Sequence, residues 1–334
     1  MAHEVVEPAD SPHEMTCMEI WGGNRATRRT VRLPGLDAWV YSSPYQQADS
    51  GGDVYYVSNC ATGRITRLLL ADVSGHGSTV SETANHLRLL MRRYVNHIQQ
   101  LKFVSSMNDA FSNLNHTGGF ATAVVATFLA PNRQLTFSNA GHPCPLVYTV
   151  RDQRWRLLET HSNDESRPRG PRDLPLGIFE NGSYAELELT LDVGDLVLFY
   201  TDAFIESRGQ DGEMLGSGPF LKLVADLELE QPETLLDRIV TKVSSLSPDN
   251  LTEDDVTMLL FRVTGEAAQV PLKNRILAPF RLLKGMALSL LNGGRGMPLP
   301  EFSRENLGLS VFASHRPPAD DEHGAGHHSL PKKG

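Results

Sequence analysis

Four short acidic segments are spread along this 334-residue chain, and each adjoins a stretch with the composition of a β-strand. They are residues 51–53 (Gly-Gly-Asp), 72–77 (Asp-Val-Ser-Gly-His-Gly), 201–203 (Thr-Asp-Ala) and 254–257 (Asp-Asp-Val-Thr). Carboxylates held at strand ends, beside glycines that let the backbone come close, supply the oxygen ligands that Mg²⁺ and Mn²⁺ prefer. Two such ions can activate water and neutralise charge on a phosphoryl group. The segments therefore predict a two-metal phosphate hydrolase.

Each acidic segment also has a purely structural interpretation. The turn that ends at Asp53 is a common start of a strand, and Asp202 follows a buried strand, where a turn is expected. The neighbours Asp254 and Asp255 are typical of a solvated turn. Asp72 is more specific, because it ends an apolar strand and leads through glycines into a helix start, where phosphate is favoured. Taken together, the four segments favour a metal site. Unrelated turns would have no reason to place aspartates at equivalent strand ends in all four cases.

Two histidines adjoin the predicted strands, and more than one role is open for each. His76 could donate a proton to a leaving alkoxide, because histidine titrates near neutral pH. It could equally cap the following helix or bind phosphate. His142 lies between two predicted strands, where a hydrogen bond that fixes the turn explains it at least as well as catalysis does.

Other chemistries lack their sequence signatures. The chain has no Gly-x-x-x-x-Gly-Lys-Ser/Thr loop, which excludes a P-loop NTPase, and no Gly-x-Ser-x-Gly nucleophile turn. Neither Cys60 nor Cys144 has the setting of a cysteine-based phosphatase, whose thiolate needs a phosphate loop with an arginine. The formal net charge of -9 argues against general nucleic-acid binding.

The cysteines and the N-terminal residues indicate in which cellular compartment the protein is expected. Three widely spaced cysteines form neither a disulfide framework nor a zinc spacing, so we expect a cytoplasmic protein. The first residues are acidic and contain no apolar run, so no signal peptide is expected. No segment has the roughly 18 continuous apolar residues of a membrane span.

Hydrophobic periodicity divides the chain into three parts. Residues 1–35 look like a polar arm with a basic patch, residues 36–264 like one compact domain, and residues 265–334 like a C-terminal extension. Within the domain we expect helices over 80–98, 106–114, 216–228 and 232–246, and strands over 54–57, 64–73, 120–129, 134–139, 146–150, 155–158, 187–191, 196–200 and 256–263. Tight turns between strands, with helices in clusters, favour an α+β layered domain with antiparallel sheets.

Seven blocks occur in an order that resembles a known family. They are residues 51–53, 70–77 (Leu-Ala-Asp-Val-Ser-Gly-His-Gly), 120–123 (Phe-Ala-Thr-Ala), 139–142 (Asn-Ala-Gly-His), 174–177 (Leu-Pro-Leu-Gly), 194–202 (Gly-Asp-Leu-Val-Leu-Phe-Tyr-Thr-Asp) and 254–257. Residues 36–263 are similar to the bacterial PP2C-like serine/threonine phosphatases (PPM type), and among them to the SpoIIE- and RsbU-like branch. The resemblance implies an α-β-β-α sandwich of two antiparallel sheets flanked by helices, with two Mn²⁺ or Mg²⁺ ions at one end.

The resemblance also implies the metal ligands. They are Asp53, Asp72, the carbonyl of Val73, Asp202 and Asp254. Asp72 is expected to bridge the two ions, and Asp202 and Asp254 to bind the second one. Successive side chains of an extended segment point to opposite faces, so Asp254 and Asp255 are not expected to reach the same metal. The family match assigns Asp254 and leaves Asp255 to hydrogen-bond nearby, although a bulge at residue 254 would reverse this.

The implied reaction removes phosphate from phosphoserine or phosphothreonine on a signalling protein. The catalytic residues implied are Asp53, Asp72 and His76, acting with a metal-activated water and without a phosphoenzyme. By analogy with the family, the substrate is a phosphorylated anti-sigma-factor antagonist. The alternative is a catalytically weak or inactive relative that binds phosphoproteins, and the four retained aspartates favour the enzyme.

Three positions depart from the family pattern. Tyr56 stands where many relatives have a second aspartate, and Ala203 stands where glycine is usual. Relatives sometimes have lysine at the position of His76. None of these departures removes an implied metal ligand, so we expect an active enzyme.

The C-terminal extension contains a basic, apolar stretch at residues 272–291 without an acidic residue. A basic amphipathic helix there could contact an anionic membrane surface peripherally, although Pro279 should kink or break it. Docking of this stretch onto the phosphatase domain is the alternative. Residues 316–334 are expected to be disordered.

Overall fold

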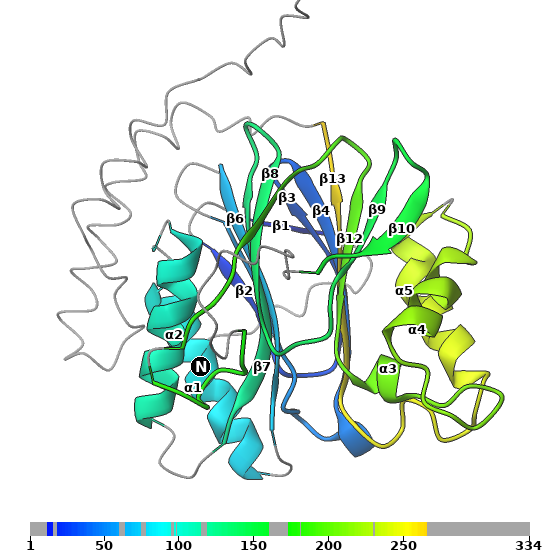
Figure 1. The fold of residues 1–334 in the computed structure, drawn as a ribbon, viewed down its shortest axis with the longest axis horizontal. Helices are drawn as coiled ribbons and strands as arrows, with labels where there is room; N and C mark the ends of the chain where they lie inside the picture. Colours follow the sequence, from blue (N-terminus) through cyan, green and yellow to red (C-terminus); the bar gives the residue numbers. More distant parts are fainter. Residues whose placement is uncertain are drawn as a thin grey trace, which may run out of the picture.

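The computed structural model describes residues 12–15, 19–59, 64–74, 78–94, 97, 99–114, 119–159, 173–180, 182–229 and 231–265. Two β-sheets pack face to face, and helices cover the outer face of each sheet (Figure 1). The predicted fold class, an α+β sandwich with the layers helix, sheet, sheet and helix, is confirmed.

The first sheet has the strand order β1-β3-β4-β13-β12-β9-β10. Its strands are β1 (His13–Glu14), β3 (Thr27–Leu33), β4 (Leu36–Ser43), β9 (Leu146–Thr149), β10 (Arg154–Leu157), β12 (Leu196–Tyr200) and β13 (Val256–Val263). Neighbouring strands are antiparallel except β1 and β3, which are parallel. The last strand that the structure describes, β13, therefore lies in the middle of this sheet, where its first residue, Val256, pairs with Ser43.

The second sheet has the order β11-β8-β7-β6-β5-β2, and all its neighbouring strands are antiparallel. Its strands are β2 (Ile20–Gly23), β5 (Val54–Asn59), β6 (Ile65–Val73), β7 (Ala121–Leu129), β8 (Gln134–Ala140) and β11 (Leu187–Thr190). The register between β6 and β7 places Asp72 directly opposite Thr122.

The helices form two groups. α1 (Ser78–Tyr94) and α2 (Gln100–Leu114) cover the second sheet, and α4 (Ser217–Ala225) and α5 (Pro232–Ser244) cover the first (Figure 1). A short helix, α3 (Ala203–Glu206), follows β12 directly, and a 3-10 turn, η1 (Tyr45–Gln47), follows β4. α5 has proline at its first helical position, where the missing N–H has no partner to lose.

Strand alternation explains the layers, because successive side chains point to opposite faces of a sheet. On β6, Leu68 and Leu70 belong to the buried residues between the two sheets, here called the inner cluster. Leu69 and Ala71 point the other way and pack with α1 and α2. A third cluster joins the first sheet to α4 and α5, and we call it the outer cluster.

The structure corrects the N-terminal boundary expected at residue 36. β2 pairs with β5, and β3 pairs with β4 over its whole length. Val31 and Leu33 are buried in the inner cluster, whereas Arg28 and Arg32 point outward and are exposed. The alternation of apolar and basic residues is therefore that of a half-buried strand, and the basic patch made it look like a polar arm.

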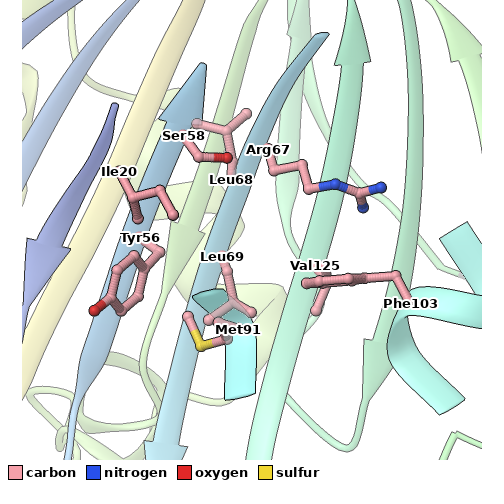
Figure 2. A pocket seen from close by; sticks show the side chains of 9 residues that line it. All are labelled: Ile20, Tyr56, Ser58, Arg67, Leu68, Leu69, Met91, Phe103 and Val125. Carbon is pink, nitrogen blue, oxygen red and sulfur yellow. The ribbon is translucent and has the colours of Figure 1, made fainter. Parts of the chain in front are cut away.

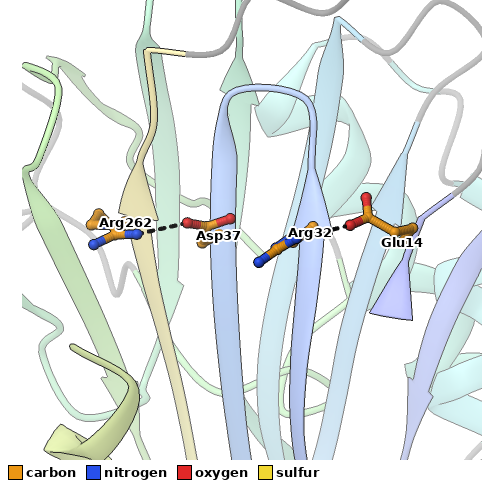
Figure 3. Close-up of polar contacts among 4 residues, drawn as sticks. All are labelled: Glu14, Arg32, Asp37 and Arg262. Atoms are coloured by element: carbon orange, nitrogen blue, oxygen red, sulfur yellow. Dashed lines mark hydrogen bonds and ion pairs between the residues drawn. The ribbon is translucent and has the colours of Figure 1, made fainter. Parts of the chain in front are cut away.

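A row of charged side chains runs across the outer face of the first sheet (Figure 3). Arg262 of β13 donates to Asp37 of β4 at 2.8 Å, and Arg32 of β3 donates to Glu14 of β1 at 3.3 Å. The Arg32–Glu14 pair is exposed and contributes little to stability, whereas the Arg262–Asp37 pair is partly buried. The row shows instead that the N-terminal strands are integral parts of the sheet.

The helices depart from the sequence predictions in two notable places. α2 begins at Gln100, six residues before the expected start at residue 106, and its apolar side chains Phe103 and Val104 are buried. The short helix α3 was not predicted at all. A four-residue helix has too few turns to show the periodicity on which such predictions depend.

None of the described helices has the length and apolar character needed to cross a membrane. Residues 266–334 lie outside the described residues, so the contact expected through 272–291 and the disorder expected over 316–334 stay predictions.

Candidate functional site

The strand ends beside the four aspartates of the acidic segments lie at the same end of the sandwich, at the bottom of Figure 1, where α3 also lies. Strands β4, β6 and β12 end there, and β5, β7 and β13 begin there. Asp53 precedes β5, Asp72 lies near the end of β6, Asp202 follows β12 and Asp254 precedes β13. Segments that lie as far apart in the sequence as Asp53 and Asp254 are thus neighbours in space.

At this end the space between the sheets changes from apolar to polar. The inward positions of β6 are Leu68, then Leu70, then Asp72. On β5 the same alternation places Asp53 on the face of Tyr55, which belongs to the inner cluster. Asp53 is buried, with 3% of its surface exposed, and Asp72 is partly buried. The carboxylates therefore lie at the mouth of the space between the sheets.

Three buried hydroxyl side chains of the first sheet face these carboxylates. Ser42 Oγ and Thr257 Oγ1 are 3.0 Å apart, and the Thr257 amide donates to Thr201 Oγ1 at 3.0 Å. The Thr201 amide donates to the Thr257 carbonyl at 3.0 Å. A further hydrogen bond from Thr257 to the Asp53 side chain lowers the pKa of that carboxyl and partly offsets the effect of its burial. The hydroxyls thus fix the spacing of β4, β13 and β12 below the carboxylates.

Asp255 binds the backbone of the protein. Its Oδ2 accepts a hydrogen bond from the Gly52 amide at 2.6 Å, and its Oδ1 accepts one from the Tyr45 amide at 2.7 Å. A Cβ atom at Gly51 would lie 2.3 Å from Asp255 Oδ1, so only glycine fits there. Asp255 therefore holds the turn that presents Asp53.

Asp254 has a different environment from its neighbour. Its Oδ1 accepts a hydrogen bond from the Asp255 amide at 2.7 Å, and its side chain lies at the surface of the cluster. Both oxygens of Asp255 accept hydrogen bonds from amides, whereas among the described residues Asp254 accepts one from the Asp255 amide only. This difference supports the assignment of Asp254, rather than Asp255, as a metal ligand.

Burial and mutual repulsion raise the pKa values of the cluster. Burial raises the pKa of Asp53 well above its usual range, and repulsion by Asp72 and Asp255 raises it further. Burial, followed by repulsion from Asp202 and Asp254, raises the pKa of Asp72 to about 7. Loss of hydration likewise raises the pKa values of Asp202 and Asp254. Cations would relieve this repulsion, because an opposite charge favours the ionised carboxylate.

The cluster also contains an unsatisfied ligand atom. Asp53 Oδ2 is buried and has no hydrogen-bond partner among the described residues. A buried carboxylate oxygen without a partner is costly unless a proton or a cation binds it. No three histidine, cysteine or acidic side chains in the described part of the chain are already arranged around one metal position. The residues fit Mn²⁺ or Mg²⁺, which retain waters and need only a few protein ligands.

The remaining predicted residues have different outcomes. The Val73 carbonyl faces the Gly-Gly-Asp turn, since its oxygen would lie 3.0 Å from a Cβ atom at Gly52. His76 lies outside the described residues, so its role stays a prediction. His142 is buried in the turn after β8, where its amide donates to Asn139 Oδ1 at 2.8 Å. These contacts agree with the structural role, which was one of the two roles that the sequence left open for His142.

The side chains of two positions that depart from the family pattern point away from the space between the sheets. Tyr56 points from β5 toward α1 and α2, on the face opposite to Asp53, so an aspartate at that position would not join this cluster. Ala203 packs with Phe204 in the outer cluster. Neither side chain takes a place in the space between the sheets.

Sequence reasoning missed several members of this site. Glu206 of α3 adds to the repulsion that raises the pKa values of Asp72 and Asp202. The hydroxyls of Ser42, Thr201 and Thr257 were given no role. The sequence does contain a pattern that could have identified these hydroxyls. Each lies two residues beyond the terminal inward-pointing apolar residue of its strand and so continues the same alternation.

A small cavity lies away from this site (Figure 2). It has a volume of about 20 Å³ and is lined by side chains of the second sheet, α1 and α2, among them Leu69, Met91 and Phe103. A cavity of this size has room for at most one water, and apolar cavities stay dry. The cavity is apolar and contains none of the candidate ligands.

Comparison with known proteins identifies the family of this chain. The sequence model of the family described as Stage II sporulation protein E (SpoIIE) matches residues 62–264. The phosphoserine phosphatase RsbU of Bacillus subtilis (strain 168) is 22% identical over 249 residues, which cover 73% of this chain and 69% of that protein.

Solved structures show the same fold. The RsbU and RsbW domains of a Mycobacterium tuberculosis protein superpose with a TM-score of 0.55 at 23% identity, over 77% of this chain and 69% of that one. RsbX in complex with magnesium gives a TM-score of 0.51 at 15% identity, over 71% of this chain and 100% of that one. At these identities the likeness concerns the fold alone.

Proposed function

Because the chain belongs to the SpoIIE family, we propose that it is a metal-dependent protein phosphatase that hydrolyses phosphoserine or phosphothreonine. The observation that carries this proposal is the cluster of repelling carboxylates at the mouth between the sheets. Its members Asp53 and Asp72 have raised pKa values, and Asp53 Oδ2 has no partner among the described residues. Such a cluster is costly in a protein that binds no cation and useful in one that does.

Five groups would hold two Mn²⁺ or Mg²⁺ ions. They are the carboxylates of Asp53, Asp72, Asp202 and Asp254 and the carbonyl of Val73. When bound, the ions supply an activated water and neutralise charge on the phosphoryl group. Asp72 is the residue proposed to hold both ions, because its carboxyl interacts with Asp202 and Asp254 of the first sheet and with Asp53 of the second.

The other residues of the site position these ligands. Thr257 hydrogen-bonds to Asp53 and keeps its carboxylate turned into the space between the sheets. Asp255 holds the Gly-Gly-Asp turn through the Gly52 amide. His76 is the proposed proton donor to the leaving hydroxyl, since imidazole titrates near neutral pH.

The proposed substrate is a phosphorylated signalling protein, and the phosphorylated antagonist of an anti-sigma factor is the candidate class. The name of the RsbU relative, a phosphoserine phosphatase, supports the chemistry. Location in the cytoplasm and peripheral membrane contact through residues 272–291 are parts of the proposal that depend on the sequence alone.

The test compares hydrolysis of a phosphoserine peptide and of a chromogenic phosphate ester with Mn²⁺, with Mg²⁺ and with chelator. We expect activity only with metal, and a loss of several orders of magnitude in Asp72→Asn with the fold intact. Full activity in chelator would contradict the metal mechanism. Tight binding of phosphopeptide without hydrolysis, in the presence of bound Mn²⁺, would instead identify an inactive binding module.

A further inference from the structure

His142 lies between the two halves of the candidate site. It follows β8 of the second sheet and precedes β9 of the first, so the segment around it crosses from one sheet to the other. The side chain is buried, with 5% of its surface exposed. No role in the proposed reaction requires it to reach the substrate.

The turn that contains His142 is held firmly. The Asn139 side chain accepts a hydrogen bond from the His142 amide and donates one to the His142 carbonyl, both at 2.8 Å. Gly141 has a positive φ of 70°, and a Cβ atom there would lie 2.6 Å from the Pro175 ring. The imidazole therefore has little freedom to move away from its contacts.

The imidazole contacts the strand next to the proposed bridging ligand. His142 Nδ1 lies 2.9 Å from Thr122 Oγ1, and Thr122 is the residue directly opposite Asp72 on the neighbouring strand. Directly opposite side chains of an antiparallel pair lie on the same face, with Cβ atoms about 5 Å apart. The hydroxyl that His142 holds therefore lies beside the carboxylate of Asp72.

The other side of the ring faces the first sheet. Burial lowers the pKa of His142 to about 3, and the nearby Tyr200 backbone partly offsets this effect, although His142 Nε2 is buried and forms no hydrogen bond among the described residues. Tyr200 is the last residue of β12 and stands two residues before Asp202. One neutral ring thus lies between the strand opposite Asp72 and the strand that delivers Asp202.

We propose that His142 is a positioning residue, which together with Thr122 sets the separation of Asp72 and Asp202 across the two sheets and so determines metal affinity. The inference rests on the proposed function, because it concerns the same metal ligands. A neutral ring suits this role, since it fills the gap without adding a positive charge near the cations. Partners beyond the direct ligands commonly contribute tenfold to hundredfold to metal affinity.

The test measures Mn²⁺ binding directly by calorimetry, apart from activity. His142→Phe keeps a ring but loses both nitrogens, and Thr122→Val removes the hydroxyl without changing size. We expect each variant to bind Mn²⁺ at least about tenfold more weakly while its melting temperature changes by only a few degrees. Thr122→Ser, which keeps the hydroxyl, should restore most of the affinity. The double variant should be no worse than the poorer single one, because both act through one contact.

Ser138→Ala is the matched control. Ser138 is a buried residue of β8 whose hydroxyl has no hydrogen-bond partner among the described residues, so its loss should leave Mn²⁺ affinity unchanged. If His142→Phe does not fold, the pair Thr122→Val and Thr122→Ser tests the same contact. Unchanged Mn²⁺ affinity in folded Thr122→Val and His142→Phe overturns the inference while leaving the proposed function intact. A wild-type protein that binds neither Mn²⁺ nor Mg²⁺ overturns the proposed function itself.

Discussion

At the scale of single residues, the adjacent aspartates Asp254 and Asp255 have the same side chain but different roles. Asp255 satisfies the amides of Gly52 and Tyr45, and Asp254 keeps its carboxylate at the surface of the cluster. The roles follow from the backbone groups that surround each carboxylate.

The first prediction separates these neighbours. Asp254→Asn should lose most activity and bind the second metal poorly, with little change in stability. Asp255→Asn should keep substantial activity and lose about 1–3 kcal/mol of stability, because an amide can accept only one of the two N–H groups. Activity at saturating Mn²⁺ and chemical denaturation of both variants decide the matter. A dead Asp255→Asn beside an active Asp254→Asn would show that the ligand is the second aspartate.

The raised pKa of Asp72 gives a second prediction, which concerns the protein without metal. A carboxyl with a pKa of about 7 holds its proton in the folded state and loses it in the unfolded state at a lower pH. The folded state therefore binds more protons between the two pKa values, and stability falls as pH rises through that range. The melting temperature in chelator should thus be higher at about pH 5.5 than at about pH 8.

Asp72→Asn supplies the control for this pH effect. An amide carries no charge at any of these pH values, so the variant should show a shallower dependence of melting temperature on pH in chelator. It should also be more stable than the wild type near pH 8. Saturating Mn²⁺ should reverse the wild-type trend, because metal competes with protons for the same oxygens. A melting temperature in chelator that rises with pH would contradict the repulsion inferred for the cluster.

At the scale of elements, the N-terminal strands matter more than their composition suggests. β3 covers β4 along its whole length, and β2 covers the edge of β5, which carries Asp53 at its start. Val31 is fully buried and Leu33 nearly so. The phosphatase domain therefore begins before residue 20 in the part of the chain that the structure describes.

The third prediction follows from these strands. A chain that begins at Leu36 should fail to fold cooperatively, since it loses part of the inner cluster and exposes two strand edges. Circular dichroism and thermal melting of this truncated chain should show no cooperative unfolding transition. Arg28→Ser provides a control, because it alters the same strand on its exposed face and should leave the melting temperature nearly unchanged. If the chain that begins at Leu36 folds and is active, the domain boundary predicted at residue 36 is correct.

At the scale of the whole molecule, two sheets bring ligands from four distant segments to one end. The second sheet supplies Asp53 and Asp72, and the first supplies Asp202 and Asp254. Neither sheet alone holds the complete set of ligands, so the site depends on how the sandwich packs. The inner cluster, which contributes most of that packing, is thus a condition for metal binding as well as for stability.

The fourth prediction concerns the C-terminal extension. Every candidate ligand lies before the end of β13 at Val263, so a chain that ends at Gly265 should hydrolyse a small phosphate ester as the full chain does. The kinetic constants of both chains for the ester, measured at saturating Mn²⁺, check this. If residues 272–291 contact membranes, only the full chain should bind anionic vesicles. Loss of ester hydrolysis in the folded, shortened chain would show that the extension completes the site.

The sequence by itself determined the fold class, most of the strands and the four acidic segments, because alternation and strand-end carboxylates are local patterns. Local patterns also gave wrong predictions in two places. At β3 the basic residues suggested a polar arm although the strand is half buried, and α3 is too short to show helical periodicity. Only the tertiary structure decided that Asp255 binds amides 203 and 210 residues away, and that His142 lies between Thr122 and Tyr200. These contacts join elements that are distant in the chain. Their partners are set by the register and packing of two sheets, which the spacing of residues along one strand does not specify.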